Sequence, residues 1–176
     1  MKQHVITALV ENRSGVLARI VGLISGRGFN IDSLNVAPTQ DPSVSRMTIQ
    51  VPGDDRVLEQ VTKQLNKLID VVKVSDLTTE RFIKRELVIV KVAAAPEKRA
   101  AVKDLAAMLK AQIVSVQANS IILQFAGDRG ETGEFISLLK PFRIIDLSRT
   151  GIVAVAKGEV NGHNVEAGEK DKRGAT

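Results

Sequence analysis

The 176-residue sequence contains no cysteine, no tryptophan and no tyrosine. Without cysteine the chain has no disulfide, no zinc–thiolate site and no cysteine nucleophile, so nothing ties it to an oxidising compartment. The sequence also lacks an apolar run long enough to span a bilayer. Its N-terminus leads directly into a strand-like segment, without the apolar region of a signal peptide. These absences predict a cytoplasmic protein with no membrane association.

Aromatic residues make up only 3% of the sequence, which argues against the stacking surfaces of proteins that bind single-stranded nucleic acid. The net charge of +5 and the isoelectric point near 9.6 are the features that most favour nucleic acid. However, basic residues are scattered among acidic ones, as in 169–173, where both signs alternate. The charge pattern therefore indicates a solvated surface, and we expect no nucleic-acid partner.

The first 80 residues alternate strand-like and helix-like patterns in the order βαββαβ. Strands are predicted from β-branched residues and from alternation, and helices from apolar residues spaced three and four apart. The expected strands are 3–10, 29–36, 45–51 and 71–77, and the expected helices run from Val16 to Ile24 and from Val57 to Leu68. In the third strand, Met47, Ile49 and Val51 are expected on one face, with Arg46, Thr48 and Gln50 on the other.

The same order then repeats. Four charged residues between Glu80 and Arg85 predict a junction. The expected strands after it are 86–92, 113–116, 120–126 and 142–147, the expected helices are 97–110 and 131–140, and 151–156 offers one more strand. From Gly158 onward the chain is nearly free of apolar residues, which predicts disorder. The predicted organisation is one unit at 1–79, a second at 80–158 and a disordered tail at 159–176.

Each βαββαβ unit is typical of a ferredoxin-like fold, in which four antiparallel strands carry two helices on one face. The predicted class is therefore α+β, with two such domains in tandem. The open sheet face of each unit must be polar or covered. We expect the chain to form a homodimer, and side-by-side pairing of sheet edges is one route to it.

The segment 11–15 joins the first strand to the first helix. Asn12 or Ser14 is placed to cap that helix. A helix N-terminus also suits a carboxylate, and Gly15 would let a ligand approach the backbone. The amides of Asn12 and Asn30 can both donate and accept, which matches the two ends of an amino acid. Asn30 is expected to open the second strand and to converge with Asn12 and Gly15. These residues alone leave a structural cap and a ligand site both open.

Catalysis by the chain itself is not expected. The two histidines, His4 and His163, have no partner by spacing and are predicted to lie on the surface. No phosphate-binding loop, dinucleotide fingerprint or metal-ligand cluster is present in the sequence. An RNA-recognition domain shares the βαββαβ order, but its third strand requires stacking aromatics. The expected third strand here, 46–51, contains none.

Three motifs together resemble one family. The runs E-N-R-S-G-V-L-A-R at 11–19, R-G-F-N-I-D-S-L at 27–34 and D-P-S-V-S-R-M-T-I at 41–49 are similar to the small, regulatory subunit of acetolactate synthase, also called acetohydroxyacid synthase (AHAS). The resemblance covers about residues 2 to 158. It implies that the first half is an ACT domain, a module that senses small molecules, and that the second half is a further ferredoxin-like domain.

The resemblance also implies a ligand and a partner. Valine would bind between two ACT domains at the positions Asn12, Gly15 and Asn30, with the backbone around Val16 and Leu17 holding its carboxylate. The chain would activate a large catalytic subunit and make it sensitive to feedback inhibition in branched-chain amino-acid biosynthesis. Thiamine diphosphate, magnesium and FAD would belong to that large subunit, and this chain would bind no cofactor. The alternative is an ACT-type sensor that regulates a different enzyme or a transcription factor.

Overall fold

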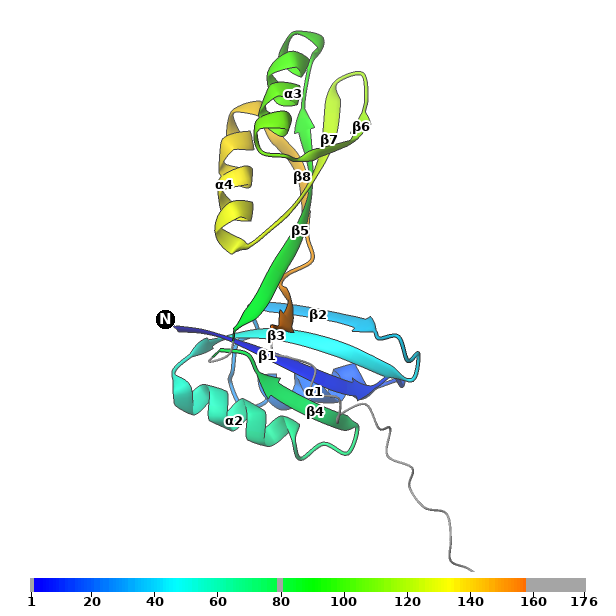
Figure 1. Ribbon diagram of the computed structural model, residues 1–176, viewed down its shortest axis with the longest axis vertical. Coiled ribbons are helices and arrows are strands. Elements are labelled where there is room, and N and C mark those ends of the chain that lie inside the picture. Colours follow the sequence, from blue (N-terminus) through cyan, green and yellow to red (C-terminus); the bar gives the residue numbers. More distant parts are fainter. Residues whose placement is uncertain (1, 79–80, 158–176) are drawn as a thin grey trace, which may run out of the picture.

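The computed structural model of the protein describes residues 2–78 and 81–157. These residues form two α+β units that follow one another along the long axis of the molecule (Figure 1). Each unit has the βαββαβ order and carries its two α-helices on one face of an antiparallel sheet (Figure 1). The predicted α+β class and the tandem ferredoxin-like arrangement are therefore confirmed. The predicted disordered tail, 159–176, lies outside the described residues.

The first unit is a four-stranded sheet in the spatial order β2-β3-β1-β4. Its elements are β1 (Lys2–Glu11), α1 (Val16–Ser25), β2 (Ser33–Pro38), β3 (Val44–Gly53), α2 (Asp55–Leu65) and β4 (Val71–Asp76). Strand β1 pairs with β3 along its whole length, so that Lys2 lies opposite Gly53 at one end and Glu11 lies opposite Val44 at the other. Asn12 and Gly15 follow the Glu11 end of β1, and the loop that contains Asn30 lies at the Lys2 end.

The two faces of β3 are as the alternation predicted, but both are buried in part. Met47, Ile49 and Val51 lie in the core between the sheet and its helices. Thr48 and Gln50, on the opposite face, are also buried. A surface-facing position would leave them exposed, so this part of the open sheet face must be covered by another segment.

The second unit is built on the spatial order β6-β7-β5-β8. Its elements are β5 (Phe82–Ala93), the 3₁₀ turn η1 (Pro96–Lys98), α3 (Arg99–Met108), β6 (Gln112–Val116), β7 (Ser120–Gly127), α4 (Arg129–Leu139), the 3₁₀ turn η2 (Lys140–Phe142), β8 (Ile144–Arg149) and β9 (Val153–Ala156). Its core includes Val90 and Leu139, and Phe135 stacks on Phe125 with ring centroids 4.9 Å apart. Leu138, on the same helix as Phe135, is 42% exposed because it falls on the solvent side of α4.

Strand β5 belongs to both units. The sequence predicted this strand only from residue 86, but β5 begins at Phe82, inside the predicted junction, and its first four residues pair with β9. This two-stranded ribbon covers the open face of the first sheet. Ile152, Ala154 and Phe82 pack there against Val5 and Leu77 of the first unit. This apolar contact with a segment distant in sequence stabilises the start of β5. The charged residues Lys84 and Arg85 made that start look like a loop in the sequence.

Side-chain caps occur at other helices than the one predicted. The Asp54 carboxylate accepts from the backbone N–H of Val57 and so caps α2. Asp128 and Glu131 form a reciprocal capping box at the start of α4. Neither cap was expected, although Asp128 followed three residues later by Glu131 matches the usual sequence signal of a capping box.

His4 is completely buried, which contradicts its predicted surface position. It lies on the helix-facing side of β1, opposite Val51. Its Nε2 atom is 4.0 Å from Asp55 Oδ1, and among the described residues this nitrogen has no hydrogen-bond partner. The other histidine, His163, lies outside the described residues.

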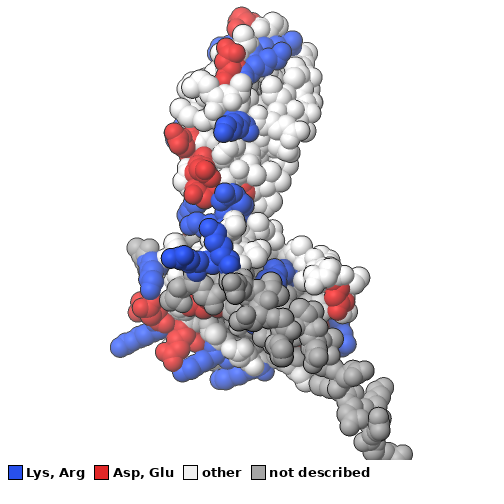
Figure 2. Space-filling model, viewed as in Figure 1, with Lys and Arg blue, Asp and Glu red and all other residues white. Residues whose placement is uncertain are grey.

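Surface charge is mixed. Figure 2 shows basic and acidic side chains next to one another along the left of the face in view and at its top, with several basic side chains near the waist between the two units. Among the described residues, none of the helices has the length and apolar character needed to cross a membrane.

Candidate functional site

The loop between β1 and α1 is tied to the turn between β2 and β3. The backbone N–H of Asn12 donates to the carbonyl of Ser43 at 2.7 Å. Its side-chain Nδ2 donates to the carbonyl of Pro42 at 2.9 Å. Asn12 therefore does not cap α1, and neither does Ser14, because the helix has no side-chain cap. The predicted capping role is wrong, since Gly15 takes the N-cap position.

Gly15 has φ +83°, in the left-handed region that only glycine adopts without strain. Helix α1 starts directly after it, with neither a side-chain cap nor an acidic residue in its first turn. The first N–H groups of a helix have no intrahelical acceptor and carry the positive end of the helix dipole. The start of α1 can therefore receive an external carboxylate. At the starts of α2 and α4, by contrast, the carboxylates of Asp54 and Asp128 already accept from the backbone N–H groups.

Val16 and Leu17, which follow Gly15, differ in their exposure to solvent. Val16 is buried and anchors α1 in the core, whereas Leu17 is 43% exposed. The side chain of Val16 is therefore closed to a ligand, and its backbone N–H donates to the carbonyl of Arg13 at 3.3 Å, a long hydrogen bond that a bound carboxylate would replace. Arg19, one turn further, pairs with Asp70 at 2.8 Å, and its guanidinium lies 3.5 Å from the place that a Cβ on Gly15 would occupy. Sequence reasoning missed Arg19, although its i+4 spacing from Gly15 on a helix is a usable signal.

Asn30 is exposed in the loop before β2 and does not open the strand, which begins at Ser33. Its Nδ2 donates to Asp32 Oδ1 at 2.7 Å. The other oxygen of Asp32 accepts from Gln3 Nε2 at 3.0 Å. Asn30 also lines an open groove of about 790 Å³ together with Phe29 and residues 52–55.

Within one chain, the two groups of predicted site residues do not converge. Asn12 and Gly15 follow the Glu11 end of β1, whereas the Asn30 loop contacts Gln3 at the opposite end. The ten residues of β1 separate them, which at about 3.3 Å per residue is about 30 Å. The reason is the fold itself, because α1 runs back along the sheet before β2 begins.

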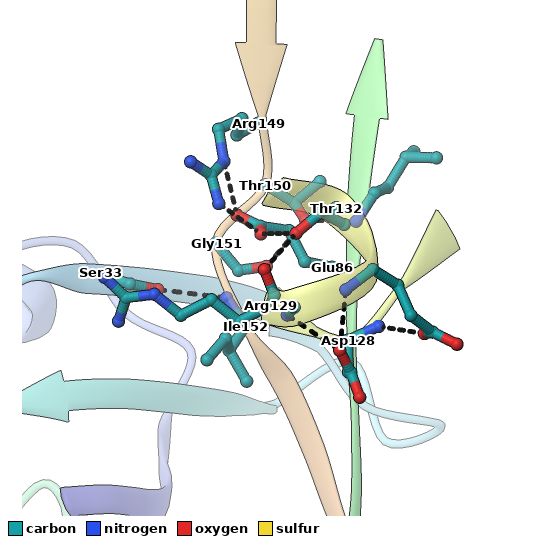
Figure 3. A network of polar contacts seen from close by, with 12 residues as sticks. Ser33, Glu86, Asp128, Arg129, Thr132, Arg149, Thr150, Gly151 and Ile152 are labelled. Carbon is teal, nitrogen blue, oxygen red and sulfur yellow. Dashed lines mark hydrogen bonds and ion pairs between the residues drawn. The ribbon is translucent and has the colours of Figure 1, made fainter. Parts of the chain in front are cut away.

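A second polar cluster lies where the two units meet (Figure 3). Glu86 of β5 is 4% exposed and accepts from Arg149 Nε at 2.9 Å, from Arg149 Nη2 at 2.6 Å and from Thr132 Oγ1 at 3.1 Å. Burial raises the pKa of Glu86, but the hydrogen bonds and positive charge of Arg149, with the bond from Thr132, outweigh it and hold the pKa below its ordinary value of 4.5. The cluster lines a groove of about 320 Å³ that also includes Asp32 and Ser33. This cluster could not be predicted from the sequence, because Glu86, Thr132 and Arg149 are far apart in the chain.

Two family models match the chain. One describes an AHAS small subunit-like ACT domain and matches residues 6–73, and the other describes the small subunit of acetolactate synthase and matches residues 85–158. The chain belongs to the family of acetolactate synthase small subunits. Its first unit is accordingly an ACT domain, and the resemblance predicted from three motifs is confirmed.

Relatives match over nearly their whole length. A probable acetolactate synthase small subunit of Archaeoglobus fulgidus is 49% identical over 156 residues, which are 89% of this chain and 98% of that protein. An acetolactate synthase small subunit of Haemophilus influenzae is 45% identical over 160 residues, which are 90% of this chain and 98% of that one. The crystal structure of the Thermotoga maritima small subunit superposes with a TM-score of 0.84 at 34% identity, covering 91% of this chain and 100% of that one.

Metal ligands do not gather in the part of the chain that the structure describes. Within residues 2–78 and 81–157, no group of three or more histidine and acidic residues is arranged to hold a metal ion.

Proposed function

We propose that this chain is a cytoplasmic, non-catalytic regulatory subunit of acetolactate synthase that binds valine, activates the large catalytic subunit and makes it sensitive to feedback inhibition. Thiamine diphosphate, magnesium and FAD belong to the large subunit. The observation that carries the proposal is the start of α1, where Gly15 leaves the helix without a side-chain cap. We retain residues 1–79 as the regulatory domain and 80–158 as the second domain, a division that the two matched ranges support.

The carboxylate of valine binds at the start of α1. Backbone N–H groups around Val16 and Leu17 donate to it, and Gly15 offers no Cβ to obstruct the approach. A negative charge at a helix N-terminus contributes about 0.3–1 kcal/mol when exposed and up to about 2 kcal/mol when partly buried. Asn12 holds this loop in place through Pro42, and its side-chain oxygen remains an acceptor for the amino group.

Asn30 completes the site from a second copy of the chain. Strand β2 lies at the edge of its sheet and runs from the Asn30 end of the domain to the Gly15 end. If two copies pair antiparallel through β2, the Asn30 loop of one lies beside Gly15 of the other, and two equivalent sites result. The separation of these residues within one chain thus supports a homodimer, which also protects an otherwise exposed strand edge.

Selectivity for valine over its larger relatives is expected to be moderate. Leucine and isoleucine each differ from valine by one methylene, and a methylene in an apolar pocket discriminates by about 1–3 kcal/mol. Cross-inhibition by both is therefore expected at higher concentrations than those needed for valine.

Reconstitution with a purified large subunit tests the proposal. The isolated chain should form no acetolactate from pyruvate, should raise the activity of the large subunit, and should make that activity fall when valine is added. Acetolactate formation by the chain alone would exclude a purely regulatory role. Failure to co-purify with the large subunit, together with retained binding of an amino acid, would instead favour the alternative of an ACT-type sensor for a different enzyme or a transcription factor.

Removal of the C-terminal segment is expected to leave the effector site intact. Every proposed site residue precedes residue 31, and the matched family range ends at 158. A chain truncated after residue 158 should therefore bind valine with the dissociation constant of the full chain, within about twofold, by calorimetry. A tenfold weaker affinity would show that 159–176 contributes to the site.

A further inference from the structure

The segment between β8 and β9 contacts the beginning of β2 in the other unit (Figure 3). The backbone N–H of Ile152 donates to Ser33 Oγ at 3.0 Å. Gly151 has φ +74°, and a Cβ at this position would overlap Ser33 Oγ. The contact among Ser33, Gly151 and Ile152, here called the junction latch, thus depends on a glycine for both its backbone conformation and its close approach.

The latch is firmly held in the second unit. Arg149, two residues before Gly151, forms the paired hydrogen bonds to buried Glu86. Thr150 Oγ1 accepts from the backbone N–H of Leu87 at 3.1 Å and donates to the carbonyl of Gly151 at 2.8 Å. A displacement of the latch therefore reaches β5 directly, and reaches α4 through the bond between Glu86 and Thr132.

In the ACT domain, the latch adjoins the Asn30 loop. Ser33 directly follows Asp32, whose carboxylate accepts from Asn30 Nδ2 and from Gln3 Nε2. The backbone N–H of Asp32 donates to the carbonyl of Gln50 and so fixes the loop to β3. Only two residues separate the proposed effector contact at Asn30 from the serine that holds the second unit.

We propose that the junction latch transmits occupation of the effector site to the second unit. The inference rests on the proposed function, because it assigns the regulation of that same site. An Asn30 amide that turns to an amino acid releases Asp32 Oδ1, the Asn30 loop relaxes, and the Ser33–Ile152 hydrogen bond weakens. The coupling between two such sites commonly changes affinity by about 5- to 150-fold. Ser33 and Gly151 act here as positioning residues and do not touch the effector.

The first experiment needs no effector. In the full chain, Asp32→Ala removes the acceptor of Asn30, and we expect hydrogen exchange at the Ile152 amide to accelerate at least tenfold and the Arg149 Nε–H resonance to shift. Asp41→Ala is the matched control, because Asp41 also accepts two hydrogen bonds in a turn of the same unit, both from Ser43, but next to the opposite end of β2. Equal behaviour of the two variants at both reporters would overturn the latch.

The second experiment uses the complex with the large subunit. Ser33→Ala and Gly151→Ala should each bind valine within about threefold of wild type by calorimetry on the full chain, yet should raise the residual activity of the complex at saturating valine severalfold. Ser137→Ala, at an exposed position on α4, is the control and should change neither quantity. Unchanged inhibition in both latch variants would contradict the proposal, as would a loss of binding that accounts for the loss of inhibition. If the wild-type chain binds no branched-chain amino acid, the proposed function fails, whereas the Asp32→Ala result still decides whether the latch connects the units.

Discussion

Replacement of Gly15 with aspartate is expected to abolish inhibition by valine while leaving activation of the large subunit near its wild-type level. The new carboxylate would lie at the start of α1, where it takes the N–H donors that we assign to valine and repels the ligand's own charge. Loss of that contact and the added repulsion should weaken valine at least 100-fold, which corresponds to about 2.7 kcal/mol. Inhibition curves of the reconstituted complex measure the effect directly, and unchanged inhibition would remove Gly15 from the site.

Gly15→Asn is the matched control for the aspartate. The two side chains have nearly the same size, and both tolerate positive φ better than most residues do. The asparagine variant therefore carries the same strain at φ +83° and the same obstruction, without the charge. Weaker loss of inhibition in Gly15→Asn would assign the difference to electrostatics at the helix start, and equal loss would assign the effect to the side-chain volume.

Mixing two inactive variants tests whether the site is shared between copies. In a two-fold dimer, a Gly15→Asp chain paired with an Asn30→Ala chain has one site with both changes and one site with neither. Valine binding absent from each parent should therefore return to half of the sites in the mixed dimer. A site contained in one chain would give no recovery.

The regular part of the fold could be predicted because its signals are local. Alternation in 45–51 and the three- and four-residue spacing in α1 depend on neighbours within the same element, and both elements occur as predicted. The start of β5 could not be predicted in this way. Its partners are β9, some 70 residues later, and the open face of the first sheet. Because these partners are distant in sequence, the local pattern showed only the charges of Lys84 and Arg85, which are not typical of a buried strand. His4 was misplaced for the same reason, since it lies among residues distant in sequence, opposite Val51 of β3 and close to Asp55 and Thr78.

The geometry of the candidate site could be predicted from the sequence only in part. Motifs located Asn12, Gly15 and Asn30 in the sequence, but spacing along the chain does not say at which end of a domain a loop lies. Asn12 faces the turn after β2, whereas Asn30 lies beside Gln3 through Asp32. The junction latch was equally invisible, because Ser33 and Ile152 are 119 positions apart and neither residue type signals contact.

The largest expected effect on stability is at Arg149. Breaking a buried ion pair by removing one partner typically costs about 3–5 kcal/mol, because the remaining charge stays buried. Glu86 is 5% exposed in its side chain, but Arg149 is 41% exposed. Solvent access to the arginine reduces the expected loss to about 2–3 kcal/mol for Arg149→Met at pH 7. The exposed pair of Lys63 with Glu59 provides the control, and Lys63→Met should change stability by less than about 0.5 kcal/mol.

Lowering the pH should reduce the difference in stability between wild type and Arg149→Met, and the direction follows from the pKa of Glu86. That pKa is held below its ordinary value of 4.5 in the folded chain. The stabilisation is therefore fully present above the unfolded value and is lost as the pH falls through the folded one. The free energies of urea unfolding of wild type and Arg149→Met should converge as the pH is lowered from 4.5 through the depressed pKa of Glu86. At pH 7, adding Glu86→Gln to Arg149→Met should restore part of the lost stability, because a buried amide requires no counter-charge. If the double variant were no more stable than Arg149→Met alone, the loss would come from packing of the arginine side chain rather than from an unpaired carboxylate.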